Sequence, residues 1–108
     1  MELEMEAKLM KVIAPHEVEA LLETDKNVTM IDVREAFEIR RGMIPGAIHI
    51  PLGKLQNSLD KLEQSKHYII VCETGSRSGV ATYLLNSLGY NASNLIGGMV
   101  DWKGPLRK

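Results

Sequence analysis

Short apolar runs alternate with segments of helical spacing along the whole chain. Each run is bounded by polar or glycine-containing residues, and most are rich in valine and isoleucine, which is typical of strands. The chain therefore predicts five strands, at residues 11–13, 28–33, 47–50, 67–72 and 92–96.

Between these runs, apolar residues recur at spacings of three and four, which predicts helices over 15–22, 52–62 and 80–88 and a short one around Trp102. Pro15 suits a first helical turn, although Ala14 before it offers no side-chain cap. Gly89 is well placed to end the third helix in a left-handed conformation.

Five short strands separated by helices predict an α/β fold, with a five-stranded parallel sheet flanked by helices on both faces. Ligands of such sheets bind beyond the carboxyl ends of the strands. We expect residues 11–108 to form this single domain. Residues 1–10 are charged and lack turn signals, and we expect them to be a loosely held lead-in.

The composition of the chain argues against several classes of function. Thirteen basic and fourteen acidic side chains give a net charge of −1, so we expect no nucleic-acid partner. The apolar runs are too short for a membrane span, and the first eleven residues are unlike a targeting peptide. The single cysteine cannot form an internal disulfide, which favours a cytoplasmic location.

That cysteine is the strongest candidate for chemistry. Cys72 ends an apolar run, and the polar loop Glu73–Gly79 after it leads into a predicted helix. Backbone N–H groups of such a loop, with the positive end of the helix, stabilise an anion such as a thiolate. We expect Cys72 to be a reactive, partly exposed nucleophile with a depressed pKa.

Four motifs lie at or near the ends of predicted strands. They are Asp32-Val33-Arg34-Glu35, Gly42-x-Ile44-Pro45-Gly46-Ala47-x-x-Ile50-Pro51-Leu52, Val71-Cys72-x-x-Gly75-x-Arg77-Ser78 and Gly97-Gly98-x-x-x-Trp102. In this order they resemble the single-domain rhodaneses, over residues 11–103. The resemblance implies a rhodanese-like domain and a sulfurtransferase that needs no cofactor. A donor such as thiosulfate would load a sulfane sulfur onto Cys72, and the persulfide would pass it to a thiol or to cyanide.

The loop after the cysteine would bind the substrate. Its N–H groups would stabilise both the thiolate and the terminal persulfide sulfur, and Arg34 would add a positive charge at the rim or form an ordinary surface salt bridge. The loop residues are Glu73, Thr74, Gly75, Ser76, Arg77 and Ser78.

The sequence leaves the roles of Arg77 and Ser78 open. Arg77 either binds a donor anion or folds back onto a carboxylate such as Asp32 or Glu35, which would then support the site structurally. Ser78 either donates to the sulfur or caps the helix. Asp32 is expected to hold neighbouring loops through hydrogen bonds.

Two residues depart from the family pattern. Glu73 follows the cysteine where many rhodaneses have a basic or neutral residue, and Met43 replaces a common histidine. Both put thiosulfate in doubt as the donor and leave a neutral or protein-bound persulfide open. Without a second cysteine, the sulfur acceptor must come from outside the chain. His16, His49 and His67 lack companions at metal-ligand spacing, so no metal is expected.

Other function classes also fit the fold. A binding or regulatory module would keep the domain without transferase activity. Cysteine phosphatases, including those that resemble rhodaneses, and arsenate reductases are a further alternative. Phosphatase loops have five residues between cysteine and arginine, whereas four separate Cys72 from Arg77. The tighter loop suits a single terminal sulfur better than a tetrahedral phosphate.

Overall fold

The structure is a computed structural model that describes residues 8–108. A five-stranded, entirely parallel sheet lies at its centre, with the strand order β1-β5-β4-β2-β3. The predicted fold class is confirmed. The strands are β1 (Val12–Ile13), β2 (Val28–Asp32), β3 (Ile48–His49), β4 (His67–Val71) and β5 (Asn91–Leu95).

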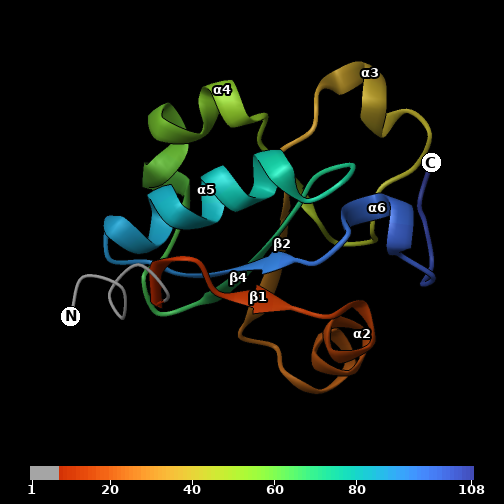
Figure 1. Ribbon diagram of the computed structural model, residues 1–108, viewed down its shortest axis with the longest axis horizontal. Helices are drawn as coiled ribbons and strands as arrows, with labels where there is room; N and C mark the ends of the chain where they lie inside the picture. Colours follow the sequence, from red (N-terminus) through yellow and green to blue (C-terminus); the bar gives the residue numbers. More distant parts are fainter. Residues whose placement is uncertain (1–7) are drawn as a thin grey trace.

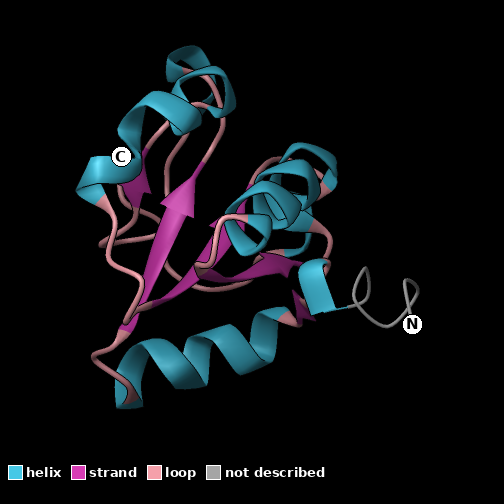
Figure 2. Cartoon of the chain, turned by 90° about the vertical axis from the view of Figure 1, so that its left-hand side faces the viewer, coloured by secondary structure: helices cyan, strands magenta, loops and turns pink. Residues whose placement is uncertain are grey.

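Helices cover both faces of the sheet (Figures 1 and 2). One buried cluster joins the sheet to α4 and α5, and a second joins the opposite face to α2 and Trp102. The helices are α2 (Pro15–Thr24), α3 (Ala36–Ile39), α4 (Leu52–Leu55), η1 (Gln56–Lys61), α5 (Ser76–Ser87) and α6 (Gly98–Asp101).

Three elements differ from the predicted ones. The helix expected over 52–62 is divided into α4 and the 3₁₀ helix η1, where Ser58 Oγ donates to the carbonyl of Lys54 at 2.8 Å. Helix α5 begins at Ser76, earlier than expected, because Gly75 before it takes a left-handed φ of 105°. Helix α3 was not predicted at all.

Strand register brings the functional loops together. Val71 at the end of β4 lies opposite Asp32 at the end of β2, and the N–H of Val33 donates to the carbonyl of Val71 at 3.0 Å. The segments that follow these two strands therefore leave the sheet side by side. The loop between β4 and α5 lies between α3 and α6 (Figure 1).

Most of the predicted lead-in lies outside the described residues. Its last part is held to the domain, since the carbonyl of Leu9 accepts a hydrogen bond from Asn86 Nδ2 at 3.0 Å. Within residues 8–108, no helix combines the length and apolar character that crossing a membrane requires.

Candidate active site around Cys72

Cys72 lies directly after β4 and is fully buried, at 0% exposure. Its Sγ accepts hydrogen bonds from the backbone N–H of Gly75 at 3.0 Å and from Ser78 Oγ at 3.2 Å. The expectation of a partly exposed thiol is therefore wrong. Cys72 belongs to the buried cluster that also contains Val33 and Ala81, and its Sγ is held by the loop that turns from β4 into α5.

The hydrogen bonds outweigh the effect of burial on the thiol. Burial alone raises the pKa of Cys72, because it penalises the charged form. The hydroxyl of Ser78 and the backbone N–H groups of Ser78, Gly75 and Thr74 act in the opposite direction. The net result is a pKa for Cys72 below its ordinary value, in the predicted direction. Of the two roles considered for Ser78, the structure has the bond to sulfur.

Helix α6 fixes the orientation of the loop backbone from outside. The N–H of Met99 donates to the carbonyl of Cys72 at 2.9 Å, and the N–H of Val100 donates to the carbonyl of Glu73 at 3.1 Å. In a trans peptide the carbonyl and the following N–H point in opposite directions. Because these carbonyls face α6, the N–H groups of Glu73 and Thr74 face the inside of the loop.

Gly98 makes this approach possible. A Cβ at this position would lie 2.5 Å from the carbonyl oxygen of Cys72 and 2.6 Å from that of Glu73, and the φ of Gly98 is 60°. Only glycine avoids both the contact with backbone atoms and the left-handed strain. The second glycine of the Gly97-Gly98 motif thus allows close packing against the cysteine loop.

Arg77 forms a two-pronged ion pair with Glu38 on α3. Its Nη1 and Nη2 donate to Glu38 Oε1 and Oε2 at 2.6 and 2.7 Å. The bonds from Arg77 lower the pKa of Glu38 to about 2. Arg77 does fold back onto a carboxylate, but the predicted partners Asp32 and Glu35 are wrong, because the unpredicted helix α3 presents Glu38 instead.

Arg34 is buried at 2% exposure rather than placed at the rim of the site, which corrects the prediction. Its Nη2 and Nε donate to the carboxylate of Asp32 at 2.8 and 3.0 Å, and Nη2 also donates to the carbonyl of Gly42 at 2.8 Å. Asp32 accepts the backbone N–H of Arg34 as well, so it holds neighbouring loops as expected. Glu73 Oε1 lies 3.5 Å from Arg34 Nη1.

The other predicted site residues lie around this core. Glu35 is exposed and precedes α3, and its N–H donates to Glu38 Oε1 at 2.9 Å. Thr74 and Ser76 are exposed on the outer side of the loop. Among residues 8–108, no three His, Cys, Asp or Glu side chains lie together as a metal site would require.

Sequence reasoning missed two residues that contact the loop. One is Glu38. The other is Asn94 of β5, whose Oδ1 accepts the Ser78 hydroxyl at 2.6 Å and whose Nδ2 donates to the carbonyl of Gly75 at 3.0 Å. Asn94 carried a signal, since it is a polar residue near the carboxyl end of β5, whereas Glu38 lies in the short helix α3 and carried none.

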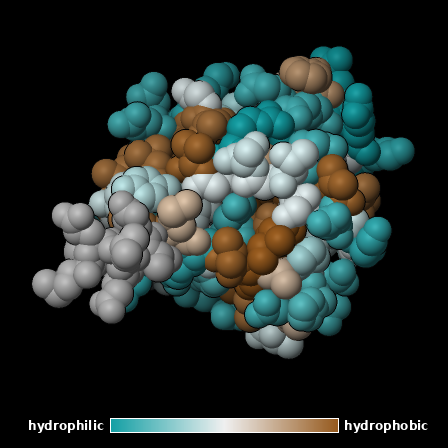
Figure 3. Space-filling view, viewed as in Figure 1, coloured by the Kyte–Doolittle hydropathy of each residue, from teal (hydrophilic) through white to brown (hydrophobic). Residues whose placement is uncertain are grey.

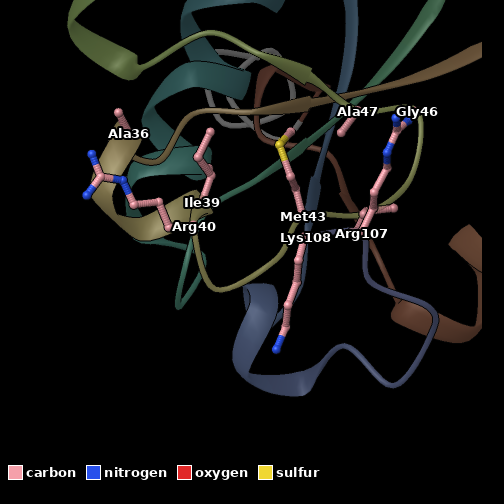
Figure 4. A pocket seen from close by; sticks show the side chains of 9 residues that line it. Ala36, Ile39, Arg40, Met43, Gly46, Ala47, Arg107 and Lys108 are labelled. Carbon is pink, nitrogen blue, oxygen red and sulfur yellow. The ribbon is translucent and has the colours of Figure 1, made fainter.

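A cavity of about 530 Å³ lies beside α3 and is separate from the thiol (Figure 4). Ile39 and Met43 form part of its apolar wall, and Arg40 and Arg107 lie at opposite sides of the view. The N–H of Met43 donates to the carbonyl of Arg107 at 2.9 Å, which brings the end of the chain to this cavity. Met43, one of the two departures from the family pattern, thus lines the cavity rather than the loop around Cys72.

The parallel sheet and the cysteine loop at its carboxyl edge define a small α/β domain with a loop-bound thiol. The model of the Rhodanese-like domain family matches residues 14–105, and the chain belongs to this family.

Two relatives and one solved structure match this chain over most of their own length. The Bacillus subtilis (strain 168) protein named "Putative sulfurtransferase YtwF" is 35% identical over 97 residues, which cover 90% of this chain and 94% of the relative. The human protein named thiosulfate:glutathione sulfurtransferase is 35% identical over 89 residues, covering 68% and 76% of the two chains. A crystal structure of a rhodanese-like domain protein from Staphylococcus aureus has a TM-score of 0.85 and 34% identity, with 91% and 97% of the two chains covered.

Proposed function

We propose that this protein is a sulfurtransferase that carries a sulfane sulfur on Cys72. The observation that carries the proposal is the environment of Sγ, where the Gly75 N–H and the Ser78 hydroxyl both donate to the sulfur. These donors stabilise a thiolate, which is the nucleophilic form of cysteine. The relatives named as sulfurtransferases give independent support.

The reaction has two balanced steps. The Cys72 thiolate attacks the outer sulfur of a donor R–S–S⁻, a new S–S bond forms, and the donor's S–S bond breaks to release R–S⁻. An acceptor thiolate then attacks the terminal sulfur of the Cys72 persulfide, takes that sulfur, and restores the Cys72 thiolate. The chain has no second cysteine, so the acceptor is an external thiol or cyanide, or a thiol on another protein.

The loop residues act mainly through their backbone in this proposal. The N–H groups of Glu73, Thr74 and Gly75 hold the negative charge first on Sγ and then on the terminal sulfur. The exposed Thr74 and Ser76 border the path by which substrate enters. Because Sγ itself has no exposed surface, loading requires a local opening of this loop. With a single cysteine and no need for a disulfide, the cytoplasm is the proposed compartment.

Phosphate chemistry is less well supported by the same loop. Four residues separate Cys72 from Arg77, and both terminal nitrogens of the Arg77 guanidinium, Nη1 and Nη2, already donate to Glu38. A binding or regulatory module would keep this geometry but would not accumulate a persulfide.

Intact-protein mass spectrometry tests the proposal directly. Wild-type protein is treated with thiosulfate and, separately, with cysteine persulfide, and its mass is measured before and after addition of cyanide. We expect a gain of one sulfur atom on Cys72 that cyanide removes with formation of thiocyanate. If neither donor adds sulfur to Cys72, the domain is a binding module and the proposed function is wrong.

A further inference from the structure

Both cationic side chains near Cys72 are already paired with carboxylates of the same chain. Arg77 forms two short hydrogen bonds to Glu38, whose side chain is 18% exposed. Arg34 is buried against Asp32 and also lies 3.5 Å from Glu73 Oε1. Each guanidinium thus already has a carboxylate partner within the chain.

The charges of this group favour one class of donor. The two arginines and three carboxylates of this group carry a net charge of −1. They are Arg34, Arg77, Asp32, Glu38 and Glu73. Thiosulfate carries two negative charges and gives up sulfite, another dianion. To form a two-pronged contact with the Nη atoms of Arg77 it competes with the carboxylate of Glu38. A persulfide carries at most one negative charge on the sulfurs that react, and its stabilisation by the loop N–H groups needs no free arginine.

Exposed side chains around the loop fit the same class. Phe37 is 68% exposed beside Glu38, and Val80 is 60% exposed near the start of α5. Val100 is 60% exposed, and its N–H donates to the carbonyl of Glu73. These apolar neighbours suit an organic persulfide with a carbon body better than a small inorganic anion. On the face seen in Figure 3, apolar surface lies in separate patches between hydrophilic side chains.

From this geometry we propose that Glu38 is a specificity-determining residue, which makes Cys72 accept sulfur from organic persulfides in preference to thiosulfate. The inference rests on the proposed function, because it concerns the donor of the same reaction. Glu38 acts through Arg77: while the ion pair is closed, the arginine is withheld from dianionic donors. The persulfide could be a small thiol compound or a cysteine of another protein, since both present the same reacting sulfurs.

The test compares donors on variants of the complete chain. Glu38→Gln removes the charge but keeps an amide oxygen that accepts one hydrogen bond from Arg77, and Glu38→Asp keeps the charge. Glu23→Gln is the matched control for loss of one carboxylate, because Glu23 is exposed on α2, remote from the loop. Initial rates are measured with thiosulfate, with cysteine persulfide, and with a persulfidated single-cysteine peptide flanked by leucines.

We expect Glu38→Gln to raise kcat/KM for thiosulfate by about tenfold at low ionic strength, the size of effect that one charge a few ångströms away produces. The values for the two persulfides should change by less than about twofold. Glu38→Asp and Glu23→Gln should leave the donor preference unchanged. Faster transfer from the peptide than from cysteine persulfide would identify a protein as the donor, and the reverse would identify a small thiol.

Three outcomes overturn the inference. The first is a Glu38→Gln variant that shows no gain with thiosulfate while persulfide transfer persists. The second is an equal loss with all donors, which indicates a merely structural role. The third needs no variant: if kcat/KM of the wild type for thiosulfate falls steeply as salt is raised, the site already offers a free cation. In each case the wild type still acquires sulfur on Cys72, which distinguishes this failure from failure of the proposed function.

Discussion

Replacing Ser78 by alanine tests how the loop activates its cysteine. The Ser78 hydroxyl lies 3.2 Å from Cys72 Sγ and is completely buried, so water cannot take its place without rearrangement. A hydrogen bond to a charged group contributes roughly 1.5–3 kcal/mol. One pKa unit corresponds to about 1.4 kcal/mol, so the full range is about one to two units.

The neighbouring amide reduces this estimate. The same hydroxyl also lies 2.6 Å from Asn94 Oδ1, and a single proton cannot serve both acceptors at once. We therefore expect Ser78→Ala to raise the pKa of Cys72 by about one unit, the low end of that range. The Gly75 N–H still donates to Sγ at 3.0 Å, so part of the activation remains.

The assay is the rate of alkylation of Cys72 by iodoacetamide as a function of pH. Below both pKa values, Ser78→Ala should react about tenfold more slowly than the wild type, because one pKa unit changes the thiolate fraction tenfold. Ser78→Thr keeps the hydroxyl and should restore most of the rate. Ser87→Ala is the matched control, since Ser87 lies at the far end of α5 and donates to the carbonyl of Leu84. An unchanged midpoint in folded Ser78→Ala would refute the assignment of Ser78 to the sulfur.

Further predictions concern Cys72, Glu73, Gly98 and Glu38. Cys72→Ser should abolish sulfur transfer and change the free energy of unfolding by only about 1 kcal/mol near neutral pH, and residual transfer would identify another carrier. The folded-state pKa of Cys72 is lowered, so the wild type should become more stable than Cys72→Ser as the pH rises from the folded-state pKa to the ordinary thiol pKa near 8.5. Above that pH the difference in stability should stay constant, and urea titrations of both proteins over this pH range can check it. Glu73→Arg should lower KM for thiosulfate about fivefold at low salt, equivalent to ~1 kcal/mol, and an unchanged KM would mean that the side chain at position 73 points away from the donor. Gly98→Ala should destabilise the fold by roughly 2 kcal/mol or more and raise the pKa of Cys72, because the Cβ would displace the loop carbonyls, and wild-type behaviour of both would contradict the packing described. The Glu38 carboxyl should titrate near pH 2 by NMR, so its contribution to stability is complete above the ordinary glutamate pKa and is lost as pH falls towards 2, whereas a midpoint near 4.5 would exclude the ion pair.

The fold could be predicted because the sequence patterns that specify it are long or occur several times. Five apolar runs, each followed by turn residues, specify the number of strands and leave parallel pairing as the arrangement that covers both faces of the sheet. Helix α2 was found from three apolar residues on one face. Helix α3 was missed because four residues span little more than one turn, which is too short to show a helical period.

The site was predicted only where the chemistry follows the sequence locally. Cys72, Gly75 and Ser78 lie within seven residues, so their contact follows from a strand, a turn and a helix start. Glu38 meets Arg77 across 39 positions, and that pairing depends on how α3 is oriented above the loop. The burial of Cys72 likewise depends on the packing of distant segments around the loop, which no local pattern reports.

The backbone bonds from α6 to the loop have a consequence for how this site can change. They engage main-chain atoms only, so the orientation of the loop N–H groups does not depend on which side chains occupy positions 73, 74 and 76. Variation at these positions can alter which molecules react while the thiol keeps its activation. A library randomised at the three positions should therefore yield many folded members with similar alkylation midpoints and widely different donor preferences. Such a separation makes the domain a suitable starting point for the laboratory evolution of new sulfur donors.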